Sequence, residues 1–381
     1  CFELGPSGCD ETCGSTLEDD ECGVCGGDGI PDGECDCAGN VLDQCNECGG
    51  DNSTCSITYY ISNAGNDNDP CTTDSPCRTI QFVIDNKARV NDTLFVVSGW
   101  YQENISIDKN IFIQSSDTLN PDLTIIEGIE PQSAVISILG SNPTITGFTV
   151  LGGDGYYGGG ISIADGAPIL SRLFIIGNTA IKGGGIYLQS SSPAISNVTV
   201  AGNSATIGHN LLFADGSHPT IISSIFWANP SQSSHIVSHS NSNCGESDGN
   251  TLDMYYSNLG GSDGNNFDLS DCYDIAASDD DTYSNADPQF VSPIGMFDST
   301  FEPPLDISEV FVYDYHLQPS SPCLNTGEPG LSLDPDHTFV DRGAFYNKSS
   351  STEFTIGCTD EDDSGNGGDY DLSCSSDIGS E

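Results

Sequence analysis

The sequence predicts an all-β protein, a right-handed parallel β-helix with about 25 residues per coil, flanked by small disulfide-rich modules. Four segments begin at a shared proline and recur at a nearly constant spacing: Pro143, Pro168, Pro193 and Pro219. Each unit holds short β-branched runs that do not reach the length of a stable helix. Short strands at a fixed period fit coils that stack about 4.8 Å apart and pair their main chains.

The repeat also predicts which side chains stack. Aliphatic residues hold equivalent inward positions: Ile145, Leu170, Ile195 and Ile221. Amide residues fall at equivalent turns and predict a hydrogen-bonded ladder: Asn178, Asn203 and Asn229. Glycine runs that begin at Gly158 and Gly183, and a single Gly208, predict sharp bends with positive φ.

Residues 1–55 form a separate cysteine-rich module. Ten of the 17 cysteines lie here, and almost no apolar residues accompany them: Cys1, Cys9, Cys13, Cys22, Cys25, Cys35, Cys37, Cys45, Cys48 and Cys55. Without a core, such a segment needs covalent bonds or metal. We expect these ten to pair among themselves; zinc bound by the Cys22-x-x-Cys25 and Cys45-x-x-Cys48 pairs is the alternative.

This module resembles known secreted repeats. The stretches "ECGVCGGDGIPDGECDC" and "QCNECGGDNSTC" resemble Cys-Gly-Val-Cys-Gly-Gly-Asp modules of large secreted proteins from bacteria and protists. The stretch "GDGIPDGECD" is similar to part of a thrombospondin type 3 calcium repeat, in which aspartates bind Ca²⁺. The resemblance implies Asp28, Asp32 and Asp36 as candidate Ca²⁺ ligands; polar turns between disulfides are the alternative.

Residues 56–346 form the β-helix domain, and its flanks resemble a known family. The stretch from "ITYYISNAGNDNDPC" to "NIFIQ" resembles the opening of secreted pectin-lyase-like β-helix proteins. That resemblance implies a capping helix over residues 79–88, with Ile80, Val83 and Ile84 facing inward. The stretches "ADPQFVS", "DYHLQPSSPCLNTG" and "DRGAFY" resemble the last coils of related bacterial surface proteins. Residues 235–287, which are polar and acidic, predict a long loop insert.

Residues 347–381 consist of a Ser-rich link and an acidic module. The module resembles the Gly-Cys-Thr-Asp modules near the ends of secreted proteins. Three further disulfides are expected: Cys71–Cys77, Cys244–Cys272 and Cys358–Cys374. One cysteine is left over. We favour Cys323 as a buried free thiol; if Cys323 is bridged, Cys1 is free and suits a lipid anchor.

The bulk charge restricts partners and location. Eight Lys and Arg face 57 Asp and Glu, a net charge of −49, which disfavours nucleic acid and anionic membrane. The sequence contains no apolar stretch of about 18 residues, so it predicts no membrane span. Seventeen cysteines indicate an oxidising compartment, so we expect a secreted, cell-surface protein. Five sequons allow N-glycosylation in a eukaryotic source: Asn52, Asn91, Asn104, Asn197 and Asn347.

Evidence for catalysis in the sequence is weak. The best cluster combines Asp165, Asp215, Arg172 and His209. The two aspartates lie two coils apart, about 10 Å, which is long for a hydrolase pair, and solvated turns explain them better. Four aromatic residues are candidates for a sugar platform, although core packing explains them equally well: Tyr156, Tyr157, Tyr187 and Trp227.

The sequence therefore favours a non-catalytic structural or adhesive subunit of an extracellular filament, sheath or appendage. Its expected partners are copies of itself and, secondarily, cell-surface polysaccharide. It requires no cofactor in this interpretation, and Ca²⁺ is the candidate ion. The alternative is a polysaccharide-binding or polysaccharide-cleaving β-helix enzyme, either a lyase or a hydrolase.

Overall fold

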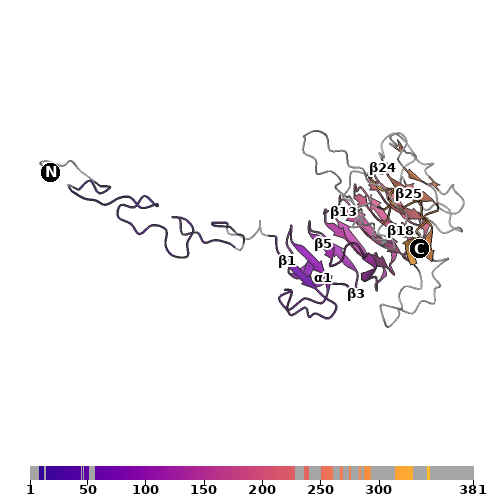
Figure 1. Cartoon of the computed structure of the whole chain (residues 1–381), viewed down its shortest axis with the longest axis horizontal. Helices are drawn as coiled ribbons and strands as arrows, with labels where there is room; N and C mark the ends of the chain where they lie inside the picture. The colour runs from indigo at the N-terminus through magenta and orange to yellow at the C-terminus, as the bar shows by residue number, and fades with distance from the viewer. Residues whose placement is uncertain are drawn as a thin grey trace, which may run out of the picture.

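The fold is a right-handed parallel β-helix, as predicted (Figure 1). It was obtained as a computed structural model. The structure describes residues 8–12, 14–43, 45, 47–50, 56–227, 236–239, 250–260, 267–268, 274–275, 283–284, 287–292, 314–328 and 341–343. Successive coils contribute strands to four parallel sheets within these residues, and the aliphatic core lies between the sheets.

Two of the sheets run almost the whole length of the stack. The nine-stranded sheet contains β1 (Thr58–Ile61), β2 (Thr93–Val96), β5 (Phe112–Ser115), β9 (Thr144–Thr146), β13 (Ile169–Ser171), β17 (Ala194–Ser196), β21 (Thr220–Ile222), β24 (Thr251–Tyr255) and β27 (Asp274–Ile275). The eight-stranded sheet contains β3 (Gly99–Gln102), β6 (Thr124–Glu127), β10 (Thr149–Leu151), β14 (Phe174–Ile176), β18 (Thr199–Ala201), β22 (Ile225–Trp227), β25 (Ser257–Gly260) and β28 (Tyr283–Ser284).

The other two sheets complete each coil. The seven-stranded sheet contains β4 (Ile105–Ile107), β8 (Ile136–Leu139), β12 (Ile161–Ala164), β16 (Ile186–Gln189), β20 (Leu211–Ala214), β23 (Ile236–His239) and β26 (Phe267–Asp268). The four-stranded sheet contains β7 (Pro131–Gln132), β11 (Asp154–Tyr157), β15 (Thr179–Lys182) and β19 (Ser204–Ile207). A 3₁₀ turn, η1 (Pro121–Leu123), precedes β6.

The register confirms the repeat seen in the sequence. Ile169 pairs with Thr144 on one side and with Ala194 on the other, and Ala194 pairs with Thr220. The segments that follow the four prolines therefore stack directly on one another. The predicted aliphatic column is paired and buried throughout, and it extends to further coils: Leu94, Ile113, Ile145, Leu170, Ile195, Ile221 and Met254.

The amide ladder is present where the structure describes it. The Nδ2 atom of Asn178 lies 3.0 Å from Oδ1 of Asn203, and both side chains are buried. The same Asn203 oxygen accepts the main-chain N–H of Asn178, so the ladder ties neighbouring coils to each other. Asn229 lies outside the described residues.

Glycine performs two tasks at the turn between the four- and seven-stranded sheets. Gly158, Gly183 and Gly208 take positive φ angles of 69°, 67° and 66°, as the sequence predicted. The next glycine is needed for a different reason. A Cβ atom on Gly184 would lie 2.5 Å from the carbonyl oxygen of His209 in the next coil, so only glycine lets the coils approach.

The N-terminal end of the stack is closed by a helix and a disulfide loop. The helix α1 spans Ile80–Asn86, within the predicted 79–88, and buries Ile80, Val83 and Ile84. The loop that contains the Cys71–Cys77 disulfide hydrogen-bonds along the outer edge of β1. It therefore covers a strand edge that would otherwise be open to aggregation.

The expectation of a loop insert over residues 235–287 is wrong. Strands β23 to β28 lie within this range, and each pairs in parallel with the strand of the preceding coil. Ser224 and the equivalent Ser257 of the next coil are 33 residues apart, whereas Asn178 and Asn203 in the earlier repeats are 25 residues apart. The wider spacing between equivalent residues breaks the sequence period here, which explains why the sequence hides these coils.

In their described residues, the segments resembling last coils do not continue the stack either. Strands β29 (Phe290–Ser292) and β30 (Asp314–Leu317) pair antiparallel with each other. Phe290, Leu317 and Cys323 pack on the outer face of the eight-stranded sheet in a second hydrophobic cluster. They bury apolar residues that project outward from the strands: Ile125, Leu151, Phe174, Ile176, Ala201 and Ile225.

Cys323 is a buried free thiol in the described part of the chain, as we favoured. Nδ2 of Asn258 donates a hydrogen bond to its Sγ atom at 3.2 Å. Burial raises the pKa of the thiol to about 11, which keeps it protonated and unreactive. Cys1, the alternative free cysteine, lies outside the described residues.

The cysteine-rich segment is held by overlapping disulfides, Cys9–Cys25, Cys22–Cys37 and Cys35–Cys48. Cys45 is also disulfide-bonded. The zinc alternative therefore does not apply, because these sulfur atoms are oxidised and zinc needs thiolates. Cys1, Cys13, Cys55 and the pairs Cys244–Cys272 and Cys358–Cys374 lie outside the described residues, as does the whole of 347–381. The seven-residue helix α1 is far shorter than a membrane span requires, and the described residues contain no helix that could serve as one.

Candidate functional site

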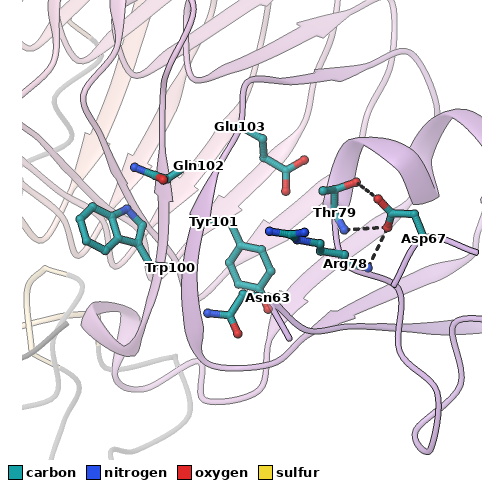
Figure 2. A pocket seen from close by; sticks show the side chains of 8 residues that line it. All are labelled: Asn63, Asp67, Arg78, Thr79, Trp100, Tyr101, Gln102 and Glu103. Atoms are coloured by element: carbon teal, nitrogen blue, oxygen red, sulfur yellow. Dashed lines mark hydrogen bonds between the residues drawn. The ribbon is translucent and has the colours of Figure 1, made fainter. Parts of the chain in front are cut away.

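A pocket of about 390 Å³ opens beside the N-terminal cap of the β-helix (Figure 2). It lies where the loop after β1, the start of α1 and strand β3 meet. The lining combines two aromatic residues with charged and amide side chains: Asn63, Asp67, Arg78, Thr79, Trp100, Tyr101, Gln102 and Glu103. Ligand pockets commonly have this size and combine aromatic walls with a few convergent polar groups.

The two carboxylates of the pocket hold the first turn of α1. Glu103 accepts the N–H groups of Ile80 and Gln81 at 2.9 and 2.8 Å. Asp67 accepts the N–H groups of Arg78 and Thr79 at 2.8 and 3.0 Å, together with the Thr79 hydroxyl. These bonds satisfy N–H groups that a helix leaves unpaired at its start. Both side chains therefore fix the wall of the pocket.

The aromatic wall comes from adjacent residues of β3. Tyr101 points inward and is buried, and its hydroxyl donates to the carbonyl of Val97 at 2.7 Å. Burial raises the pKa of Tyr101, so the phenol stays neutral. Trp100 points outward and packs, half-buried, against the second hydrophobic cluster. The alternation of β3 thus places one aromatic ring on each side of the strand.

Arg78 supplies the cation of the pocket. Its side chain is exposed, and Figure 2 shows it pointing from the start of α1 toward Tyr101 and Glu103. Gln102 is oriented by its Nε2 atom, which donates to Glu127 at 2.8 Å, so its carbonyl oxygen is left to accept. A guanidinium beside aromatic rings and amides suits a ligand rich in hydroxyl or carboxylate groups.

The pKa of the Glu103 carboxyl is shifted. Burial raises the pKa of this carboxyl above its ordinary value of 4.5, more than the two N–H bonds lower it. A raised pKa makes the group favour folding below pH 4.5, and this contribution disappears as pH rises through the folded-state pKa. The melting-temperature advantage of the wild type over Glu103→Gln should therefore shrink between pH 4 and pH 7. Aspartates titrate in both proteins, so their effects cancel in the difference between the two melting temperatures. A melting-temperature advantage of the wild type that grows over this range would contradict a raised pKa for Glu103.

The residues proposed as a catalytic cluster do not form one site. Asp165 and Asp215 lie at the turn between the seven- and nine-stranded sheets, both with φ of 55°. Arg172 lies at the next corner, between β13 and β14. His209 lies at a third corner, where its Nδ1 accepts the N–H of Ala205 at 2.9 Å. Three corners of a coil cannot supply one catalytic centre, because the core separates them.

The proposed Ca²⁺ ligands are not gathered either. Within the described residues, Asp28, Asp32 and Asp36 do not form a group with ligand spacing. Asp36 accepts hydrogen bonds from Ala38 and Asn40, and these bonds, led by the Asn40 side chain, lower its pKa. The group that does come together is Cys9, Asp19 and Cys25, but its two sulfurs form a disulfide.

Three of the five sequons lie in described residues. Asn91 is exposed, whereas Asn197 is buried and donates to the carbonyl of Asp341. Asn104 uses both ends of its amide: Nδ2 donates to Ala134, and Oδ1 accepts from Ile129 and Glu130. Asn91 is thus the described sequon best placed to carry a glycan. Asn52 and Asn347 lie outside the described residues.

Sequence reasoning missed every residue of the pocket. Its lining comes from three short segments, 63–67, 78–79 and 100–103, which no repeat period relates. The signal that existed is the cluster "GWYQE" at 99–103, where two aromatics, an amide and a carboxylate follow one another. Its importance depends on the cap loop, which brings Arg78 against it.

Comparison with known proteins finds similar solved structures but no family. No family model matches the chain, and no curated protein matches it. Among solved structures, the pectin methylesterase from carrot is 14% identical with a TM-score of 0.39, covering 55% of this chain and 65% of that one. The Aspergillus niger pectin methylesterase is 15% identical with a TM-score of 0.34, covering 55% and 68%. Pectate lyase Pel9A is 13% identical with a TM-score of 0.34, covering 77% and 97%.

The sheet topology defines the class of the protein as a right-handed parallel β-helix, and the similar structures correct one interpretation. The chain was expected to be a non-catalytic subunit of a filament, sheath or appendage. The similar structures are instead those of pectin-processing enzymes, so that expectation is wrong, and the alternative of a polysaccharide-binding or polysaccharide-cleaving β-helix is favoured. At these identities the likeness itself extends to the fold alone.

Proposed function

We propose that this protein binds extracellular polysaccharide in the pocket at the N-terminal end of its β-helix. The observation that carries the proposal is a pocket lined both by the exposed Arg78 side chain and by the half-buried Trp100 ring. Aromatic rings pack on the apolar faces of sugars, and a guanidinium donates in a planar fork to carboxylate or hydroxyl oxygens. The disulfides support an extracellular location.

The distribution of charge allows an acidic sugar as ligand. Residues 56–227 contain 14 of the 57 acidic residues and six of the eight basic residues, so their net charge is −8. The rest of the chain carries most of the negative charge. The field at the pocket is therefore much weaker than a net charge of −49 suggests, particularly since exposed charges are screened beyond about 10 Å in 0.1 M salt.

Arg78→Ala should weaken binding of a hexagalacturonate by about tenfold or more, because it removes the cation of the pocket. Titration calorimetry on the full chain measures this. Arg89→Ala is the matched control, since it removes another exposed arginine, which does not line the pocket, and should change affinity by less than about twofold. Equal effects of the two substitutions would show that only net charge matters, and the pocket proposal would fail.

Cleavage of the bound chain is a second candidate, favoured by Glu103. A carboxyl whose pKa is raised in a cleft can hold the proton that a general acid delivers. If so, the full chain releases new chain ends from polygalacturonate, and Glu103→Gln lowers the rate by about 10²-fold or more. Binding without release of ends at any pH from acid to neutral would leave binding as the function and exclude cleavage of this substrate.

A further inference from the structure

Three tyrosines form a chain of rings on the outside of the β-helix. Tyr156 and Tyr157 end strand β11, and Tyr187 lies in β16. The ring centroids of Tyr156 and Tyr157 are 4.6 Å apart, and those of Tyr157 and Tyr187 are 4.9 Å apart. Tyr156 is 50% exposed and Tyr157 is 45% exposed, whereas Tyr187 is 5% exposed. We call these residues the tyrosine platform; none of them lines the pocket.

The fold holds the platform rigidly. Tyr187 packs against Leu212 and Ala214 in a small hydrophobic cluster on the outer face of the seven-stranded sheet. Its ring supports Tyr157, and Tyr157 supports Tyr156. The turn at Gly158, with φ of 69°, brings the end of β11 next to the seven-stranded sheet. Because the rings are fixed by this stack, a ligand would not have to immobilise them on binding.

Polar groups surround the rings. Lys182 pairs with Tyr157 across the four-stranded sheet, and its ammonium lies 5.8 Å from the centre of that ring. Gln189 donates from Nε2 to Oδ2 of Asp215 at 2.9 Å, which fixes both side chains on the same side as Tyr187. Burial, and then the charge of Asp215, raises the pKa of Tyr187 to about 12, so the phenol stays neutral.

We propose that the tyrosine platform is a second carbohydrate-binding site that takes a single soluble chain of neutral pyranoses. Exposed rings offer apolar faces for sugar C–H groups, while Gln189, Asp215 and Lys182 offer partners for hydroxyls. Lys182 and Asp215 balance each other, which favours a neutral sugar over the acidic one expected in the pocket. The ring planes meet at 67° and 40°, so the platform suits a twisting single chain and not a flat crystalline surface.

The test uses the full chain, titrated calorimetrically with cellohexaose, xylohexaose and hexagalacturonate. Tyr156→Ala and Tyr157→Ala should each weaken binding of a neutral hexasaccharide by about tenfold. Tyr156→Phe should retain binding within about threefold, because the ring face remains. Phe112→Ala is the matched control: this ring is 46% exposed on β5 of another sheet, and its loss should leave affinity unchanged.

The outcomes separate the platform from the pocket. Arg78→Ala should leave neutral-sugar binding intact, and the tyrosine substitutions should leave hexagalacturonate binding intact. Melting temperatures confirm that each variant is folded. The platform proposal is overturned if the wild type binds neither neutral hexasaccharide at about 1 mM, or if Tyr156→Ala and Phe112→Ala have the same effect. Loss of neutral-sugar binding in Arg78→Ala would also overturn it, because it would place the neutral sugar in the pocket.

Discussion

Leu170→Ala should lower the free energy of unfolding by about 2–5 kcal/mol. Leu170 is 0% exposed and lies in the middle of the aliphatic column, between Ile145 and Ile195. Truncation removes methyl groups from the coil interior and leaves a cavity, which neighbouring coils cannot fill because their main chains are paired. Urea unfolding followed by circular dichroism measures the change.

The adjacent residue gives the control for this prediction. Ile169 belongs to the same strand but projects outward and is 49% exposed. Ile169→Ala should therefore cost less than about 1 kcal/mol, the scale of strand propensity alone. Similar losses for the two variants would mean that the two faces of β13 are equally buried, which is incompatible with the stacked register.

Gly184→Ala should be at least as damaging, at about 3 kcal/mol or more. The added Cβ would lie 2.5 Å from the carbonyl oxygen of His209 and 2.6 Å from that of Ser204. Both atoms are main chain and cannot move aside without separating the coils. The equivalent Gly159 has the same constraint, because its Cβ would meet the main-chain oxygens of Gly184 and Thr179.

Gly140→Ala separates this contact effect from backbone strain. Gly140 has a φ of 60°, but nothing lies within 4 Å of the position that an alanine methyl group would take. Its substitution should lower the free energy of unfolding only by the cost of holding alanine in the left-handed conformation, about 1–2 kcal/mol. Melting temperatures of the two variants check the difference. If Gly140→Ala proves the more destabilising, close approach between coils does not explain the glycine at 184.

Much of the β-helix could be predicted from the sequence because the interactions that form it are local and periodic. Every coil must present an apolar residue to the same inner position, so Ile145, Leu170 and Ile195 recur at the period of the fold. The cap helix was expected from the resemblance of the opening stretch to known β-helix proteins, and it lies within the expected residues. The sequence also contains a signal for the second hydrophobic cluster. Runs such as Phe174–Ile176 are apolar at every position, as is typical of strands covered on both faces.

The coils between 236 and 284 were hidden because they depart from the 25-residue period of the earlier coils. The spacing between equivalent residues lengthens to 33 residues from Ser224 to Ser257, so the proline-based alignment ends before them. The acidic composition of this stretch then predicted a loop. Pairing with the preceding coil stabilises these strands, and pairing between coils depends on neighbours that sequence periodicity does not reveal.

The sequence by itself determined the stacked coil, its register and its disulfide-rich flank, because each depends on residues that repeat or on cysteine content. Only the tertiary structure decided which residues lie together at the two proposed sites. Arg78 and Trp100 line one pocket because a disulfide loop folds back over β1, and Tyr157 meets Tyr187 because a glycine turn joins two sheets. Such sites are formed by contacts between distant segments, each unremarkable alone, whereas the core is formed by one pattern repeated.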